Sequence, residues 1–167
     1  MLRLLCPRMM FNTVLEVDAD RLRRQGIGGV VLDLDNTLLP WGGEAIAPEV
    51  SVWLRGLLAA NMKAGFVSNN HTSRVSALAA QFAIPYAARA LKPSGRGFRQ
   101  VMAAMQLPPE QVAVIGDQLF TDILGGNRLG CWTIWVKPLS NHEFIGTKIT
   151  RQLEAVAVRL LRAKNMI

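Results

Sequence analysis

The residues best suited to carry out chemistry are two carboxylates at the end of a predicted strand. Asp33 lies near the end of the apolar run at residues 30–34, and Asp35 directly follows it. Because the two residues are two positions apart, both side chains point to one face of the strand. Two carboxylates so placed repel each other unless a cation lies between them. Hard oxygen ligands of this kind suit Mg²⁺, and they serve Mn²⁺ as well. The spacing therefore predicts a divalent-cation site at this strand end.

Further polar residues follow the other predicted strands or precede the next helix. They are Ser68, Lys92, Asp117 and Asp122. Ligands of open parallel sheets bind beyond the carboxyl ends of the strands, so we expect these side chains to meet at one edge. Each has an ordinary explanation when taken alone, such as a helix N-cap for Asp122. Their joint placement favours a functional site.

The chain alternates short apolar runs with helical patterns, which is typical of βαβ units on a parallel sheet. Strands are expected at residues 30–34, 64–68, 86–88, 112–115 and 131–136, with 86–88 at an edge of the sheet. Helices are expected at residues 48–62, 75–82, 98–105 and 121–130. The predicted fold is α/β, a three-layer α/β/α sandwich in a single domain spanning residues 1–167.

Length and composition indicate a globular protein. With 167 residues, of which 50% are hydrophobic, the chain can bury a core, and disorder is not expected. It has no internal repeat, its apolar runs are too short to span a membrane, and no secretory cleavage site follows its start. Cys6 and Cys131 are expected to be free thiols in a reducing compartment. The expected location is cytoplasmic, with peripheral contact to a membrane left open.

The net charge of +7 is concentrated at the ends of the chain. Residues 28–136 carry eight basic and seven acidic side chains, whereas residues 1–27 and 137–167 hold the remaining excess of positive charge. Two interpretations stay open. The excess is either a solvated surface that aids solubility, or it attracts an anionic partner such as acidic lipid, nucleic acid or a polyanionic substrate.

The last segment, at about residues 148–164, has the pattern of a basic amphipathic helix. On a helical wheel its apolar residues fall in one narrow sector: Ile149, Leu153, Val156 and Leu160. Its basic residues cluster on another side: Lys148, Arg151, Arg159 and Arg162. We expect the apolar sector to pack on the core. The alternative is a helix that lies on an anionic membrane surface.

The candidate site residues also form an ordered set of motifs. In chain order these are Asp33-x-Asp35-x-Thr37, then Ser68, then Lys92, then Gly116-Asp117 followed by Asp122. The set resembles the four motifs of the haloacid-dehalogenase-like (HAD) superfamily, over nearly the whole chain. The resemblance implies a Rossmann-like parallel sheet and a phosphatase that forms an aspartyl-phosphate intermediate.

The resemblance also implies a role for each motif residue. Asp33 would be the carboxylate nucleophile, and Asp35 would protonate the leaving group and then activate the hydrolytic water. Ser68, the backbone of Asn69 and the charge of Lys92 would hold the phosphoryl group.

The same resemblance implies Mg²⁺ as the cofactor. Its ligands would be Asp33, the main-chain carbonyl of Asp35, and Asp117. Asp122 would orient these ligands or pair with Lys92. The metal would neutralise charge and align the reacting groups.

HAD enzymes for small metabolites commonly insert a cap domain between the first and second motifs or between the second and third. Residues 37–68 hold only a short flap around Trp41, one helix and one strand, and residues 68–92 hold one helix and a short strand. No cap domain fits in either stretch, which corresponds to the capless subfamily III. An open site of this kind suits a large or surface-presented phosphate ester, unless a partner chain covers it.

Longer stretches narrow the resemblance to the YqeG-type HAD phosphatases. These stretches are residues 26–41, 68–70, 90–93 and 115–130. The family includes relatives of the mitochondrial phosphatidylglycerophosphate phosphatase, so the resemblance implies a lipid phosphomonoester as substrate. The alternatives are a phosphatase for nucleic-acid ends, a phosphoprotein or a soluble sugar phosphate, and a non-catalytic binding protein of the same fold. No RNA-binding motif is visible, so specific nucleic-acid binding is not expected.

Four further residues near the motifs are candidates for contact with lipid or substrate. Leu39 and Trp41 would either pack the flap or dip into lipid. Asn127 and Arg128 follow the fourth motif and would bind substrate, although Arg128 also fits the solvated surface of a helix.

Overall fold

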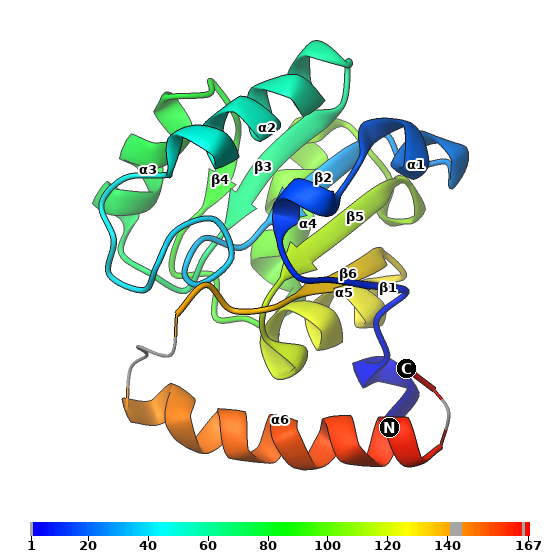
Figure 1. Ribbon diagram of the computed structural model, residues 1–167. Helices are drawn as coiled ribbons and strands as arrows, with labels where there is room; N and C mark the ends of the chain where they lie inside the picture. Colours follow the sequence, from blue (N-terminus) through cyan, green and yellow to red (C-terminus); the bar gives the residue numbers. More distant parts are fainter. Residues whose placement is uncertain (1, 141–144, 165) are drawn as a thin grey trace.

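The computed structural model describes residues 2–140, 145–164 and 166–167, and a six-stranded parallel sheet forms its centre (Figure 1). The strand order across the sheet is β1-β6-β5-β2-β3-β4, and each neighbouring pair runs parallel. The strands are β1 (Met9–Phe11), β2 (Gly29–Leu32), β3 (Lys63–Val67), β4 (Tyr86–Ala87), β5 (Val112–Gly116) and β6 (Trp132–Val136).

Helices cover both faces of this sheet. The α-helices are α1 (Ala19–Arg24), α2 (Pro48–Ala59), α3 (Thr72–Ala80), α4 (Gly95–Met105), α5 (Leu124–Leu129) and α6 (Ile145–Ala163). The 3₁₀ turns are η1 (Leu2–Leu5), η2 (Val14–Glu16) and η3 (Pro109–Gln111), and η4 (Leu119–Ile123) is a π-helical turn. Helices α1, α2 and α3 pack on one face of the sheet, and α4 and α5 pack on the other.

Helices bury both faces of the sheet, and successive strand residues point to opposite faces. Val30 and Leu32 of β2 pack in the core with α1, α2 and α3, whereas Val31 packs with α4. Both cores are apolar, as parallel strands covered on two sides require. The predicted three-layer α/β/α sandwich is therefore confirmed.

Two elements near the N-terminus go beyond the sequence prediction. β1 has three residues and pairs with β6, so β6 is an inner strand of the sheet. A strand this short has too few residues for an alternating pattern to appear. Helix α1 has six residues and begins after Asp18, whose carboxylate accepts hydrogen bonds from the backbone N–H groups of Asp20 and Arg21. The predicted edge strand at 86–88 is present as β4, at the opposite edge from β1.

Helix α6 lies along the lower side of the molecule in Figure 1, against η1 and η4. Its orientation shows that the predicted packing of its apolar sector on the core is wrong. Leu153, Val156 and Leu160 are 58%, 52% and 46% exposed. The side chain of Ile149 falls outside the described residues.

A different side of α6 faces the protein. Ala157 and Leu161 are buried against η1 and η4, and Glu154 is buried beside them. The Glu154 carboxylate accepts a hydrogen bond from the backbone N–H of Phe120 at 3.2 Å. This polar contact and the narrow apolar contact fix the rotation of the helix, which periodicity alone does not reveal. Of the helices in the described ranges, none is long and apolar enough to cross a membrane.

Both cysteines are free thiols, as predicted. Cys6 Sγ donates to the Met166 carbonyl at 3.0 Å, which links the two ends of the chain. Cys131 is buried under α4, and burial raises the pKa of its thiol to about 12.

Candidate active site

The turn after β2 carries two carboxylates at the carboxyl end of the sheet. Asp33 directly follows β2, and its backbone N–H donates to the Ile115 carbonyl of β5 at 3.0 Å. The chain then turns at Asn36 with a φ of 60°, a conformation that asparagine adopts more readily than most residues. The turn leaves the side chains of Asp33 and Asp35 on the wall of one cavity.

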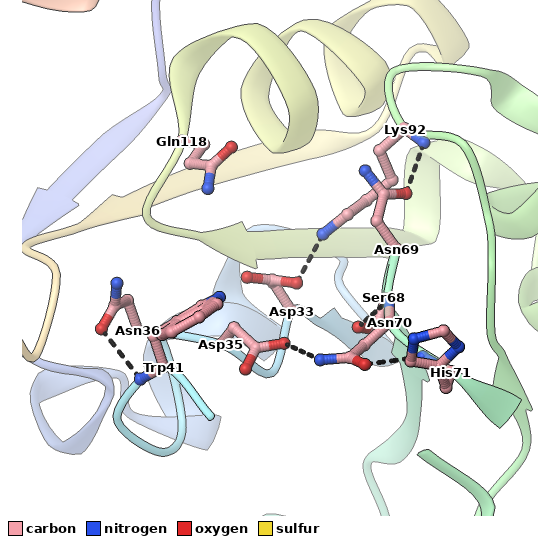
Figure 2. Close-up of a pocket in the computed structure, with 10 residues that line it drawn as sticks. All are labelled: Asp33, Asp35, Asn36, Trp41, Ser68, Asn69, Asn70, His71, Lys92 and Gln118. Carbon is pink, nitrogen blue, oxygen red and sulfur yellow. Dashed lines mark hydrogen bonds and ion pairs between the residues drawn. The ribbon is translucent and has the colours of Figure 1, made fainter. Parts of the chain in front are cut away.

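A buried ion-pair network centres on Lys92, and Figure 2 shows its contact with Asp33. Its Nζ lies 2.5 Å from Asp33 Oδ1 and 2.7 Å from Asp122 Oδ1. The side chains of all three residues are at most 8% exposed. A buried charge is costly unless it is paired and hydrogen-bonded, so the ammonium and the two carboxylates stabilise one another in this position.

Burial and the neighbouring charges shift the pKa values of Asp33 and Lys92. Burial raises the pKa of Asp33 to about 6, and the positive charge of Lys92 opposes the rise while the Asp122 carboxylate adds to it. For Lys92, burial acts to lower the pKa, but the carboxylates of Asp122 and Asp33 outweigh it and hold the pKa above its usual range. At pH 7 Asp33 is therefore mostly ionised and Lys92 is charged.

Asp117 brings another carboxylate to this network from the end of β5. One oxygen from each of Asp33, Asp117 and Asp122 lies within 4.8 Å of the others, and all three residues are buried. The Thr37 hydroxyl lies 3.2 Å from Asp117 Oδ1 and 3.4 Å from Asp33 Oδ2. Three buried carboxylates beside the charge of Lys92 suit an additional cation, and oxygen donors are the ligands that hard divalent ions prefer. The donor set fits a metal ion.

Asp122 reaches this cluster through the π-helical turn η4. Its Oδ2 accepts a hydrogen bond from the backbone N–H of Gln118 at 3.2 Å. A Cβ at Gly116 would lie 2.3 Å from the Asp122 carboxylate, so this position must be glycine for the carboxylate to pack there. The helix predicted at 121–130 is thus η4 followed by the shorter α5. Turns of the π type occur often at functional sites.

A cavity of about 450 Å³ opens at this edge of the sheet, and Figure 2 shows the side chains around it. Ser68 is buried at the end of β3, where its Oγ accepts a hydrogen bond from the backbone N–H of Asn70 at 3.1 Å. Asn69 Oδ1 accepts from the backbone N–H of Lys92 at 2.7 Å. Asn69 therefore fixes the loop that delivers the lysine to the cavity.

Asp35 is held by a second ion pair. Arg74 Nη1, from α3, lies 2.8 Å and 3.1 Å from the two Asp35 oxygens, and Asn70 Nδ2 donates to Asp35 Oδ2 at 3.2 Å. The Arg74 guanidinium also donates to the Gly43 carbonyl through Nε and Nη2. Arg74 therefore ties the flap, which we define as residues 39–43, to the carboxylate of Asp35.

The chain is similar to known phosphatases over most of its length. The family model of the mitochondrial phosphatidylglycerophosphate (PGP) phosphatases matches residues 2–139. The chain belongs to this family. The probable phosphatase YqeG of Bacillus subtilis is 34% identical over 161 residues, covering 96% of this chain and 94% of that protein. The chloroplastic PGP phosphatase 1 of Chlamydomonas reinhardtii is 33% identical, over 89% of this chain but only 59% of that longer protein.

Solved structures share the fold of this PGP phosphatase family member. The cobalt-bound deoxy-D-mannose-octulosonate 8-phosphate phosphatase of Haemophilus influenzae matches with a TM-score of 0.53 and 19% identity, covering 66% of this chain and 68% of that one. A putative HAD hydrolase of subfamily III A from Legionella pneumophila has a TM-score of 0.52 and 16% identity, over 70% and 67%. These likenesses establish the HAD fold, and the family match makes the protein a HAD-type phosphatase.

The structure brings the predicted site residues of this phosphatase to one edge of the sheet. They are Asp33, Asp35, Ser68, Asn69, Lys92, Asp117 and Asp122. Of the two roles considered for Asp122, pairing with Lys92 is observed directly. Between residues 37 and 92, all of which are described, the chain adds only the flap, α2, β3, α3 and β4, so no cap domain is inserted there.

The four further residues near the motifs differ in their positions in the structure. Leu39 is fully buried, which agrees with the interpretation that it packs the flap and not with contact to lipid, whereas Trp41 lines the cavity and is 45% exposed. Asn127 donates from Nδ2 to two carbonyls of the N-terminal segment, so the suggested contact with substrate is wrong. Arg128 is exposed on α5, outside the cavity lining.

Several residues at or beside the cavity escaped the sequence prediction, among them Asn36 and Asn70, which line it. Arg74 holds Asp35, and His71 and Gln118 line the cavity. Arg74 lies in the first turn of α3, where a positive charge opposes the helix dipole. That unfavourable position is the signal in the sequence that marks it. His71 and Gln118 have no comparable signal.

Arg74→Gln is expected to release the flap. Glutamine cannot contact both Asp35 oxygens and the Gly43 carbonyl together, so the flap should open more often. We expect hydrogen–deuterium exchange over residues 39–43 to rise by about tenfold, with exchange in β2 and β5 unchanged. Arg55→Gln on α2 is the matched control, because it loses a hydrogen bond to the Gln81 carbonyl and a contact with the Phe82 ring but touches neither Asp35 nor the flap. Unchanged exchange in the flap would contradict this role of Arg74.

Proposed function

We propose that this phosphatase is a Mg²⁺-dependent phosphomonoester hydrolase that works through an aspartyl-phosphate on Asp33 and acts on a lipid phosphate such as PGP. The observation that carries the proposal is the buried cluster beside the cavity, where Lys92 pairs with Asp33 and Asp122 and the Asp117 carboxylate lies close to both of these carboxylates. In this proposal Asp33 is the nucleophile, Lys92 is its paired cation, and Asp33 and Asp117 are metal ligands.

In the first step Asp33 attacks the substrate. An oxygen of its carboxylate forms a bond to phosphorus, the P–O bond to the alcohol breaks, and the leaving oxygen takes a proton from Asp35. Lys92, 2.5 Å from Asp33, offsets the negative charge on nucleophile and phosphate. Ser68 and the backbone of Asn69 hold phosphoryl oxygens.

In the second step water releases the phosphate. The water oxygen bonds to phosphorus, its proton passes to Asp35, and the bond to Asp33 breaks, which restores the free carboxylate. Asp35 must therefore stay in place through both steps. The contacts from Arg74 and Asn70 supply that positioning.

Asp33, Asp117 and the main-chain carbonyl of Asp35 would hold Mg²⁺, and Asp122 would orient these ligands. When bound, the cation supplies charge neutralisation and alignment, which make up most of what phosphoryl transfer requires.

Two observations support a lipid substrate. The C. reinhardtii relative is named as a PGP phosphatase, and it is 33% identical. In addition, no inserted domain between residues 37 and 92 closes the cavity, and the half-exposed Trp41 stands at its wall. An open cavity with an apolar side chain at its edge suits a phosphate presented on a lipid surface.

A substrate panel tests the proposal. Phosphate release from PGP in mixed micelles would be compared with release from a sugar phosphate, a nucleotide and an aryl phosphate, in Mg²⁺ or EDTA. We expect the lipid to be hydrolysed fastest and EDTA to abolish release. Mg²⁺-dependent release from the soluble esters alone would refute the lipid substrate and keep the mechanism. No release from any ester would refute both.

Asp35→Asn is expected to slow turnover of PGP by ~10²–10⁴-fold, because it removes the proton donor of the first step and the proton acceptor of the second. An aryl phosphate has a good leaving group and needs little protonation, so its first step should survive. We therefore expect the phosphorylated enzyme to accumulate with this substrate, measured by intact mass after acid quenching. Equal losses on both esters, without accumulation, would argue against the double role.

A further inference from the structure

Three of the larger apolar side chains in the described part of α6 face solvent rather than the protein. Leu153, Val156 and Leu160, which we call the apolar stripe, are about half exposed and follow one side of the helix. The side that packs on the protein offers only Ala157 and Leu161 as buried apolar residues within the described part of the helix. A helix that served only to cover the core would show the opposite distribution.

The outward direction of the stripe is fixed by contacts on the inner side of α6. Glu154 is 3% exposed and accepts a hydrogen bond from the backbone N–H of Phe120, which belongs to the turn directly after Asp117. In the segment that leads to α6, the backbone N–H of Leu139 donates to the Asn36 carbonyl at 2.9 Å. The helix is therefore attached to the part of the molecule that forms the cavity.

Positive charge accompanies the stripe. Arg159 and Lys164 are exposed and lie on either side of it around the helix, and Arg162 is exposed beyond Arg159. Within residues 153–164 the sequence has one acidic residue, Glu154, and it is buried against the protein. The outer surface of this segment is therefore apolar and cationic.

We propose that the apolar stripe of α6 docks on an anionic lipid surface, with Arg159, Arg162 and Lys164 at the lipid head groups. The proposal rests on the proposed function and names the surface that holds the enzyme at a lipid substrate. Interfacial helices bind in this manner: apolar side chains enter the boundary between head groups and acyl chains, and basic side chains stay among the head groups.

Charge and area favour a membrane over a second copy of the chain. Two stripes facing each other across a symmetric interface would bring the same arginines and lysine together. Three side chains on one helix also cover far less than the ~800 Å² per partner of a stable interface. An anionic surface satisfies the apolar stripe and the surrounding positive charge at once.

Co-sedimentation of the full chain with vesicles tests the proposal. The probes are vesicles of phosphatidylcholine alone and of phosphatidylcholine with phosphatidylglycerol. The wild type is expected to bind the anionic vesicles at low salt and to dissociate at high salt. Leu153→Gln/Leu160→Gln is expected to weaken binding by ~10-fold or more, and Arg159→Gln/Arg162→Gln to weaken it at low salt.

Two matched variants control for general effects of hydrophobicity and charge. Leu15→Gln/Val52→Gln removes two other apolar side chains, which are 42% and 71% exposed. Arg23→Gln/Arg24→Gln removes the same net charge from α1. Both controls should bind like the wild type, and all four variants should hydrolyse a soluble aryl phosphate at the wild-type rate.

Three outcomes would overturn the proposal. They are a wild type that does not bind anionic vesicles, equal binding by the α6 variants and their controls, and a wild-type dimer in analytical ultracentrifugation that Leu153→Gln/Leu160→Gln dissociates. The last would make the stripe an interface between copies. The aryl phosphate assay separates these results from the proposed function, because a wild type without phosphatase activity would refute the mechanism while the vesicle assay still decides the docking surface.

Discussion

Asp33→Asn is expected to lower phosphate release by ~10⁴-fold or more, because it removes the oxygen that bonds to phosphorus and so removes the covalent step. The fold should survive this change. Asparagine has nearly the shape of aspartate, and Lys92 keeps Asp122 as a partner at 2.7 Å, so no buried charge is left unpaired. Loss of activity in a folded protein is therefore the expected result.

The measurement combines initial rates with intact mass. Wild-type enzyme quenched in acid during turnover of an aryl phosphate should carry one phosphoryl group, and the Asp33→Asn variant should carry none. Asp20→Asn is the matched control, since the Asp20 side chain is 73% exposed in a surface pair with Arg23. A variant that turns over close to the wild-type rate would mean that water attacks the substrate directly, without Asp33.

Lys92→Met is expected to lower the free energy of unfolding of the metal-free protein by ~3–5 kcal/mol. The ammonium contacts Asp33 and Asp122, whose side chains are 8% and 1% exposed, and Asp117 lies in the same cluster. Methionine fills a similar volume but leaves these buried carboxylates without the lysine charge. Urea unfolding in EDTA measures the loss. Phosphate release should fall as well, by ~10²–10³-fold, because the charge near phosphorus is gone.

The pH dependence of this loss has a defined sign. Burial raises the pKa of Asp33 to about 6, above its unfolded value of 3.8, so the metal-free folded state binds more protons between these values. Stability therefore falls as pH rises through this window. Lys92 opposes the rise in pKa, so its removal extends the window upward. The variant should recover stability near pH 5, and Mg²⁺ should restore part of it at neutral pH, by binding the folded state.

Lys63→Met is the matched control for this second substitution. Lys63 Nζ contacts the Met105 carbonyl, a neutral partner, so its removal leaves no buried carboxylate unpaired. Its stability should stay close to that of the wild type and should not respond to Mg²⁺. If Lys92→Met were as stable as this control at neutral pH in EDTA, the cluster would not depend on the lysine charge.

Much of the architecture follows from the sequence because the relevant signals are local. Short, nearly continuous runs of apolar residues predict β2, β3, β5 and β6, since each strand is buried on both faces. Chemistry-bearing residues such as Asp33, Ser68 and Asp117 directly follow these strands. In a parallel sheet the carboxyl ends of adjacent strands meet, so order along the chain was enough to predict that these residues share one edge.

Contacts between separate elements could not be predicted from the sequence and follow only from the tertiary structure. The pair between Arg74 and Asp35 depends on how α3 packs beside the flap, and no spacing along the chain encodes that angle. The rotation of α6 is similar. Its periodicity identifies an apolar side, but the buried Glu154 and the narrow contact at Leu161 select a different side to face the protein. A sequence pattern records which residues share a face of a helix, whereas the neighbouring elements determine which face is covered.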